Sequence, residues 1–256
     1  MFGLRNTRGS CWVNATLQAL FRIPELQKRF TDGEEDSNNP IETCLSEIWG
    51  SRGDEGLNDF YSAIKTVYMP AGDGIGDSHE LFVALCDKVP FLDKLVRFKV
   101  AKVIECKNCK AKDVLPDTYT ELSVTPMRRR QSVSETIVDI VRPVDIPDWN
   151  CEKCKTKGAG CTSQFLIGSF PQILVFHSCS VVGSVMYTPV LNLNEHTYAL
   201  FAVVCFTGGH WFTYGRNMPP GKPWHLLDDN NVQTYDPKHF PMADNMRLLM
   251  YYRINE

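Results

Sequence analysis

The sequence predicts an α+β fold, because its two halves carry different patterns of apolar residues. In the first hundred residues, apolar side chains recur at helical spacing. After about residue 96, segments become β-branched and alternate between apolar and polar residues, which is typical of strands. Two C-x-x-C pairs, Cys106/Cys109 and Cys151/Cys154, lie in this second part. We expect one interdependent unit with a mainly antiparallel C-terminal half.

Each expected helix has apolar residues three or four positions apart, and the helices are placed at 11–21, 25–30, 41–50, 57–67 and 78–89. Pro24 is expected to open the second helix and Gly50 to end the third. Asp77 or Ser78 is expected to cap the fifth. Segments 31–40 and 70–77 are rich in Gly, Asp, Asn and Pro, so we expect loops there.

The strand candidates share β-branched and aromatic residues, and they lie at 96–106, 118–126, 170–182, 187–194, 197–206 and 210–216. The last two flank a turn at Gly208 and Gly209. The short basic run at 127–130 is interpreted as a solvated turn between strands.

The composition limits the classes of partner. The chain has 256 residues, of which 43% are hydrophobic, enough for a sizeable core. A formal charge of −3 gives no broad basic field, so nucleic acid is not a favoured partner. We see no signal peptide, and the longest uninterrupted apolar run, 198–206, is too short to span a membrane. We therefore expect an intracellular protein, cytoplasmic or nuclear, whose ten cysteines are not paired as disulfides.

The two C-x-x-C pairs predict a structural zinc site. Each pair can present two thiolates to one metal ion, and two pairs complete a tetrahedral four-cysteine site. The alternative is four free surface thiols, with Cys161 as a further candidate ligand. The remaining cysteines lie in apolar segments and are interpreted as small buried residues: Cys44, Cys86, Cys179 and Cys205.

Cys11 is the candidate nucleophile. It lies in "GLRNTRGSCWVNATLQAL", where a Gly/Ser/Asn-rich loop meets a helical pattern. A nucleophilic thiol needs a base and a group that orients the base. His210 follows the Gly-Gly turn, and Asp228 in "WHLLDDNNV" would lie beside it if two strands joined by a loop pair. From the residues alone this set is one reading, and Cys11 as a plain core residue is the other. His79 is interpreted as a structural or surface residue.

Four blocks, in order, extend this pattern over essentially the whole chain. They are "GLRNTRGSCWVNATLQAL", "GIGDSHELF", the two C-x-x-C pairs with "CEKCKTKGAGCTSQFLIGSFPQILVFH", and "YALFAVVCFTGGHWFTYGR" followed by "WHLLDDNNV". The chain thereby resembles the catalytic domain of ubiquitin-specific proteases, papain-like cysteine peptidases that remove ubiquitin. The resemblance implies a papain-like fold with a helical thumb over about 1–96. It also implies zinc-bearing β fingers over about 97–165 with part of 178–197, and a β-rich palm mainly over 166–256.

The resemblance also implies roles for single residues. Cys11 matches the family's nucleophile, His210 its general base, and Asp228 the acid that orients this base. Asp229 is a candidate assistant, and Asn6 matches the family's oxyanion-hole asparagine. The cysteines of the two pairs match the zinc ligands of the fingers.

The substrate channel implied by the resemblance is narrow. Gly208, Gly209 and Trp211 are suited to wall a channel for the Gly-Gly tail of ubiquitin. Asp77 lies where the family has an acid near the arginine-containing tail, and Glu80 is a further candidate.

The chain also departs from the family pattern. Gly76 replaces a usual Gln, Phe206 replaces a usual His, and the loop before His210 is shorter than usual.

The expected function is therefore a thiol-dependent isopeptidase that acts on ubiquitin conjugates, with one Zn²⁺ per chain. The expected partners are ubiquitin and its conjugates, and the catalytic domain is expected to be monomeric. A protease for a ubiquitin-like modifier such as SUMO is the first alternative. A module that grips ubiquitin without cleaving it, and a zinc-stabilised scaffold with an inert Cys11, are the others.

Overall fold

The computed structural model describes residues 1–7, 9–53, 55–68, 75–124, 130–156, 160–178, 184–218, 220–235 and 240–254. The predicted loop at 70–74, most of the basic run at 127–130, and Cys179 lie outside these residues.

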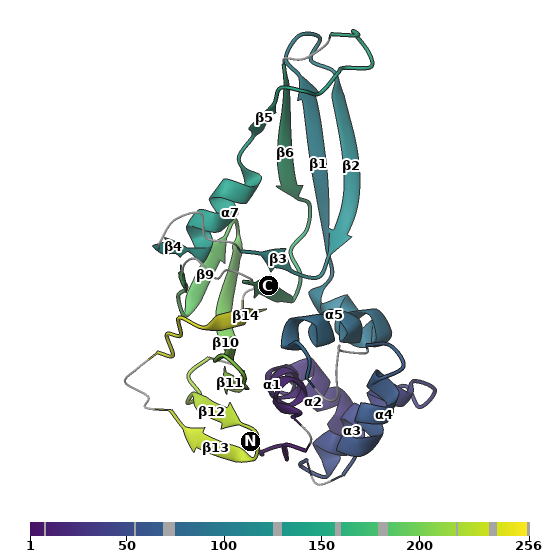
Figure 1. The fold of residues 1–256 in the computed structure, drawn as a ribbon, viewed down its shortest axis with the longest axis vertical. Coiled ribbons are helices and arrows are strands. Elements are labelled where there is room, and N and C mark those ends of the chain that lie inside the picture. Colours follow the sequence, from purple (N-terminus) through teal and green to yellow (C-terminus); the bar gives the residue numbers. More distant parts are fainter. Residues whose placement is uncertain are drawn as a thin grey trace.

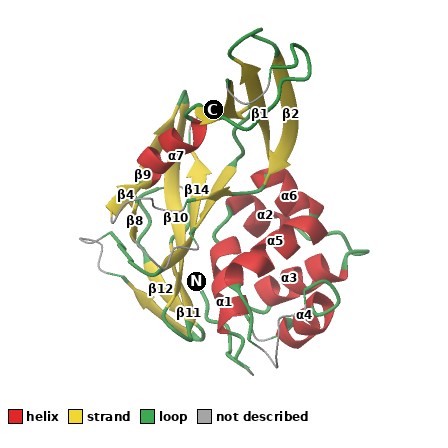
Figure 2. Ribbon diagram, turned by 45° about the horizontal axis from the view of Figure 1, so that its top comes forward, coloured by secondary structure: helices red, strands yellow, loops and turns green. Residues whose placement is uncertain are grey.

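The described residues of the N-terminal part form six helices, which make one lobe on the opposite side from most of the strands in Figure 2. The helices are α1 (Cys11–Leu20), α2 (Pro24–Thr31), α3 (Pro40–Gly50), α4 (Leu57–Ile64), α5 (Ser78–Lys88), α6 (Pro90–Val96) and, later in the chain, α7 (Val133–Val141). The predicted limits at Pro24 and Gly50 are confirmed. Asp77 caps α5, as predicted, by accepting hydrogen bonds from the N–H groups of His79 and Glu80.

The strands are β1 (Phe98–Cys106), β2 (Lys112–Tyr119), β3 (Leu122–Ser123), β4 (Arg130–Ser132), β5 (Val144–Ile146), β6 (Cys161–Ile167), β7 (Ile173–His177), β8 (Ser184–Met186), β9 (Val190–Leu193), β10 (His196–Phe206), β11 (Trp211–Gly215), β12 (His225–Asp228), β13 (Asn231–Thr234) and β14 (Met246–Arg253). Most pairs are antiparallel, as predicted, whereas β3–β7 and β4–β8 are parallel.

Beyond the helices, the described residues form two large sheets and a two-stranded sheet, β4–β8. The central sheet has eight strands in the order β13-β12-β11-β10-β14-β7-β3, with β9 paired to β10. The finger sheet, in the order β2-β1-β6-β5, projects away from the helices and the central sheet (Figure 1). The largest hydrophobic core lies between the helical lobe and the face of the central sheet that the lobe covers. There, α1 packs on β11 and β10.

One predicted strand is wrong in extent. The alternating segment 118–126 was expected to be a single strand, but β2 ends at Tyr119 and the short β3 starts at Leu122. The chain leaves the finger sheet and enters the central sheet between these residues, so one continuous strand cannot form.

No helix among the described residues combines the length and the apolar character that a membrane span needs.

Candidate active site

Cys11 occupies the first position of α1. Its side chain is 7% exposed and belongs to the core between helices and sheet. The loop before it is fixed by Asn6, whose Oδ1 accepts hydrogen bonds from the N–H and hydroxyl of Ser10 at 2.9 and 3.3 Å. The N-terminal end of a helix favours negative charge, so this position suits a thiolate.

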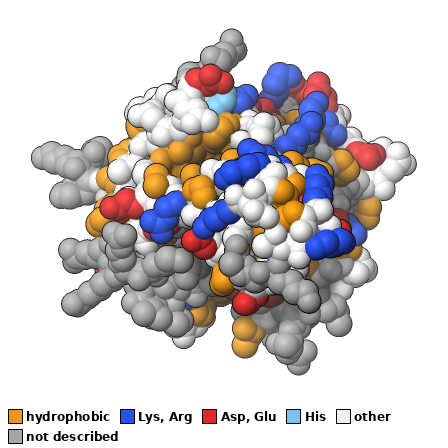
Figure 3. Space-filling model, turned by 90° about the horizontal axis from the view of Figure 1, so that it is seen from above, with side chains coloured by type: hydrophobic (Ala, Val, Ile, Leu, Met, Phe, Trp, Pro, Cys, Tyr) orange, Lys and Arg blue, Asp and Glu red, His pale blue; other side chains and the backbone are white. Residues whose placement is uncertain are grey.

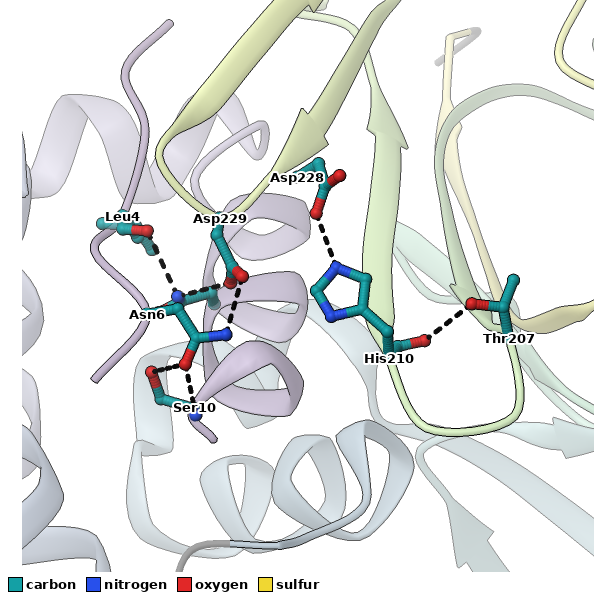
Figure 4. Close-up of polar contacts among 8 residues, drawn as sticks. Leu4, Asn6, Ser10, Thr207, His210, Asp228 and Asp229 are labelled. Atoms are coloured by element: carbon teal, nitrogen blue, oxygen red, sulfur yellow. Dashed lines mark hydrogen bonds and ion pairs between the residues drawn. The ribbon is translucent and has the colours of Figure 1, made fainter. Parts of the chain in front are cut away.

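His210 and Asp228 meet at one corner of the central sheet. The Nε2 atom of His210 lies 2.6 Å from Oδ1 of Asp228 (Figure 4). The pairing of β11 with β12, in which Thr213 lies opposite Leu227, produces this approach. This is the arrangement predicted from the sequence, in which two strands joined by a loop pair with each other.

Helix α1 lies directly against the strand that follows His210. Thr213 on β11 donates its hydroxyl proton to the carbonyl of Ala15 on α1 at 2.8 Å. Because Nε2 of His210 is used by Asp228, the other ring nitrogen, Nδ1, is the one left for a proton from a substrate or a thiol. Cys11 and His210 thus come from two elements that are bonded to each other.

Asp229 serves a different partner from Asp228. Its Oδ2 atom accepts a hydrogen bond from Nδ2 of Asn6 at 2.7 Å, and Oδ1 accepts from Nδ2 of Asn14 at 2.8 Å. The backbone N–H of Leu4 donates to the carbonyl of Asp229 at 2.9 Å. Asp229 therefore holds the N-terminal segment and Asn6, while Asp228 holds His210 (Figure 4). We call these five residues the catalytic corner: Asn6, Cys11, His210, Asp228 and Asp229.

The four predicted metal ligands come together at the far end of the finger sheet, the fingertip. Their sulfur atoms all lie within 4.8 Å of one another. The distances are 3.7 Å for Cys106–Cys154 and 3.7 Å for Cys109–Cys151. Four thiolates around a zinc ion at about 2.3 Å would be about 3.8 Å apart, so the residues fit this metal.

The surroundings act on the thiols of the cluster in opposite directions. A backbone hydrogen bond from Ala111 lowers the pKa of Cys109, but desolvation and the neighbouring sulfurs outweigh it and raise this pKa to about 12. Hydrogen bonds from Thr156 lower the pKa of Cys154 to about 6. Figure 3 looks down on this end of the molecule and shows Lys and Arg side chains gathered among apolar ones. Lys107, Lys110 and Lys153 are exposed beside the ligands. Cys161 is buried and lies opposite Cys106 in the β1–β6 pairing, outside the four-sulfur cluster.

Comparison with known proteins identifies the family. The sequence model described as ubiquitin carboxyl-terminal hydrolase matches residues 2–251. The chain belongs to this family.

The relatives within it are distant and much longer. Human ubiquitin carboxyl-terminal hydrolase 42 is 22% identical over 99% of this chain and 23% of its own length. Mouse ubiquitin carboxyl-terminal hydrolase 24 is 24% identical over 68% of this chain and 8% of its own length. The chain thus spans less than a quarter of the curated relatives it matches.

Solved structures of the family share the fold. The SAGA DUB module Ubp8/Sgf11/Sus1/Sgf73 bound to monoubiquitin contains a chain that matches with a TM-score of 0.81 and 15% identity, over 100% of this chain and 69% of that one. The same module bound to ubiquitin aldehyde gives a TM-score of 0.81 at 16% identity, over 100% of this chain and 70% of that one. The predicted α+β fold of a ubiquitin-specific protease is therefore confirmed.

In this family member the turn before His210 is open. Gly208 and Gly209 have φ values of 60° and 155°, and a Cβ at either would meet no atom within 4 Å. Trp211 is only 6% exposed and packs against Phe206, with ring centroids 4.7 Å apart. The glycines therefore border open space, whereas Trp211 is buried against Phe206.

Asp77 and Glu80, the predicted tail-binding acids, lie together at the start of α5. Oδ1 of Asp77 accepts a hydrogen bond from the N–H of His79 at 2.6 Å, so one of the two carboxylate oxygens of Asp77 caps the helix. Glu80 is exposed and accepts a hydrogen bond from the hydroxyl of Tyr68 at 2.7 Å. It also lines a pocket of about 700 Å³ between α5 and the base of β2.

Several side-chain partners in this region could not be predicted from the sequence, including those of His79, which was interpreted as a structural or surface residue. His79 pairs with Glu121 at 2.6 Å and stacks on His177, with ring centroids 3.4 Å apart. Tyr61 donates to the carbonyl of Ser10 at 3.5 Å, and burial raises its pKa. Only the tertiary fold brings these partners together, so no local motif could have revealed them.

Proposed function

We propose that this chain is a thiol-dependent isopeptidase that cleaves after the C-terminal glycine of ubiquitin in conjugates. The observation that carries the proposal is the 2.6 Å pair of His210 and Asp228 on strands packed against the helix that Cys11 opens. The family membership supports it, as do the solved relatives bound to monoubiquitin and ubiquitin aldehyde.

In the first step, Nδ1 of His210 takes the proton of Cys11, and the thiolate attacks the carbonyl carbon of the terminal glycine. Asp228 holds the ring through Nε2 and stabilises the imidazolium. The C–N bond to the lysine then breaks, and the imidazolium returns its proton to the leaving amine. The product is a thioester between Cys11 and ubiquitin.

Negative charge develops on the carbonyl oxygen during this step. Asn6 has one amide N–H engaged by Asp229, which leaves its second N–H to donate to this oxygen. The backbone N–H of Cys11 is the other donor. One oxyanion donor contributes about 2.7–4 kcal/mol to stabilising such a transition state.

In the second step, water replaces the amine. His210 removes a proton from a water molecule, the hydroxide attacks the thioester carbonyl, and the C–S bond breaks. Free ubiquitin leaves with a carboxylate, and the thiolate of Cys11 is restored.

A ubiquitin probe with a C-terminal electrophile tests the proposal. We expect covalent capture by the unmodified chain and none by Cys11→Ala. Noncovalent binding without capture would support a ubiquitin-binding module instead, and no interaction would support an inert scaffold. SUMO carrying the same electrophile runs in parallel, and preferential capture of SUMO would reassign the substrate.

We further propose that the four fingertip cysteines hold one Zn²⁺. Four sulfur ligands leave no open coordination position, so the ion would be structural, and it would cross-link β1 to the segment before β6. Elemental analysis of protein purified without chelators should give one zinc per chain. A content near zero would reject the assignment.

Three further expectations remain predictions: the limits of thumb, fingers and palm, a monomeric catalytic domain, and an intracellular location.

A further inference from the structure

The acidic turn before α5 is bonded to the helix that carries the nucleophile. Trp12 follows Cys11 directly, and its side chain is 3% exposed. Its carbonyl accepts a hydrogen bond from the hydroxyl of Ser78 at 2.8 Å, and Ser78 is fully buried. Thr16 donates in turn to the carbonyl of Ser78 at 3.1 Å. The turn that presents Asp77 is therefore fixed relative to α1.

Tyr68 contacts the same two elements, the start of α5 through its hydroxyl and α1 through its ring. This hydroxyl accepts the N–H of Asp77 at 3.1 Å and donates to Oε2 of Glu80 at 2.7 Å. Its ring packs edge-on against Trp12, with centroids 5.5 Å apart and an interplanar angle of 75°. Burial raises the pKa of Tyr68 to about 12, so the hydroxyl keeps its proton near neutral pH.

Gly76 makes room for this arrangement. A Cβ built on Gly76 would lie 2.7–2.9 Å from ring atoms of Trp12, closer than real Cβ contacts allow. Any side chain here would displace the indole, and the ring of Tyr68 rests on that indole. The loss of the usual Gln at this position is thus coupled to the packing of Trp12 and Tyr68.

Building on the proposed function, we propose that Tyr68 is a positioning residue for recognition of the cationic tail of the substrate. Glu80 is exposed, and without the hydroxyl its carboxylate would sample many rotamers in solvent. With the hydroxyl bonded, Glu80 is tied to the turn that presents Asp77, so the cap and the first turn of α5 carry both carboxylates of the pair, and each can accept hydrogen bonds from a guanidinium. The pair would select a tail with arginine upstream of Gly-Gly, and the Trp12–Gly76 contact keeps Tyr68 in place.

The test measures cleavage of a fluorogenic amide at the ubiquitin C-terminus by Tyr68→Phe. We expect KM to rise about fivefold to tenfold, as for the loss of one ordinary hydrogen bond, with kcat within about twofold. Tyr252→Phe is the matched control, because the hydroxyl of Tyr252 also donates to a glutamate, Glu25, at 2.7 Å, but from β14. This control should keep the unmodified KM.

A second substrate separates positioning from a general structural effect. On ubiquitin whose tail arginines are replaced by alanine, Tyr68→Phe should cause no further rise in KM. An equal rise on both substrates, or a loss confined to kcat, would overturn the role of Tyr68. Gly76→Gln should raise KM for unmodified ubiquitin at least as much as Tyr68→Phe, and an unchanged KM would overturn the role of the Trp12 contact.

A double variant distinguishes the proposed role of Tyr68 from misfolding of Tyr68→Phe. Glu80→Gln alters an exposed side chain. The double variant with Tyr68→Phe and Glu80→Gln should have a KM no higher than that of Glu80→Gln alone, because the two residues act together. Additive losses would count against the proposal. If the unmodified chain cleaves neither substrate, the proposed function is wrong, and this inference is wrong with it. That outcome is distinct from a failure of the inference alone, in which the unmodified chain cleaves ubiquitin but the variants do not behave as expected.

Discussion

The catalytic corner and the fingertip both gather side chains from distant parts of the chain, but different forces hold them together. The corner lies over the largest hydrophobic core, to which Cys11 and the neighbour of His210, Trp211, contribute. Its polar members are also bonded to one another, as Asn6 is to Asp229. Here, burial and hydrogen bonds fix the geometry before any ligand arrives.

The fingertip has almost no core of its own. Its buried cluster is small and consists of Ile104, Cys106, Cys151 and Cys161, with Ile146 and Cys154 packed against it. The neighbouring strand β2 is exposed at every position. Burial of this size cannot offset the entropy of ordering the chain, so we expect the fingertip to depend on the proposed Zn²⁺ far more than the corner depends on any ligand.

Loss of a zinc ligand should produce the largest effect and should stay local. Cys151→Ser is expected to release the ion, whose binding contributes about 10–16 kcal/mol in isolated zinc-finger peptides, and to unfold the finger sheet. Hydrogen exchange should show lost protection in β1 and β6 and retained protection in α1. Cys161→Ala, at a buried cysteine that is not one of the four proposed ligands, is the control and should keep the zinc. Global unfolding with Cys151→Ser would break the contrast between the two regions.

Truncation in the core under the corner should cost the next largest amount. Leu17 on α1 is fully buried, so Leu17→Ala is expected to lower the free energy of unfolding by about 2–5 kcal/mol. Val114 on β2 is 57% exposed, and Val114→Ala should change the same quantity by less than about 0.5 kcal/mol. Urea denaturation of both variants provides the measurement. Similar losses would mean that the fingers carry a core after all.

The difference between the corner and the fingertip also explains which site residues could be predicted from the sequence. The pair of His210 and Asp228 could be predicted because the two strands that carry them are short, adjacent and joined by one connection. The four zinc ligands could be predicted because the C-x-x-C spacing itself encodes the geometry. The zinc ligands thus depend on a local motif, whereas the residues alone left Cys11 with His210 and Asp228 as one of two interpretations, and the resemblance to the family favoured it.

The missed elements lacked such local signals, or their signals were overlooked. Strand β2 is exposed at every position, so it shows no alternation, and it forms because it pairs with β1. Helix α7 did carry a readable signal, the capping box of Ser132 and Glu135. The bond from Asn14 to Asp229 joins residues 215 positions apart, and only the packing of α1 against the sheet creates it.

Within the corner, the two adjacent acids should differ in effect. Asp228→Asn removes the charge that holds His210 and is expected to lower kcat by about 100-fold or more. Asp229→Asn acts through Asn6, which Ser10 still holds, so we expect a smaller loss, about tenfold. Steady-state cleavage of a fluorogenic ubiquitin amide measures both. A larger loss for Asp229→Asn would make the oxyanion donor, and not the orientation of the base, the more sensitive part of the corner.

The smallest effect is expected at His177, where the finger chain re-enters the central sheet. Burial and the adjacent His79 lower the pKa of His177, although Glu121 opposes this shift. The folded state therefore favours the neutral ring, and stability is retained above the ordinary histidine pKa and lost as pH falls through the lowered one. Because the site is partly solvated, His177→Phe should reduce the loss of unfolding free energy between pH 7 and pH 5.5 by only a few tenths of a kcal/mol. Urea titrations at both pH values measure it, and an unchanged pH dependence would mean that His177 gains its proton in the folded state as easily as in the unfolded chain.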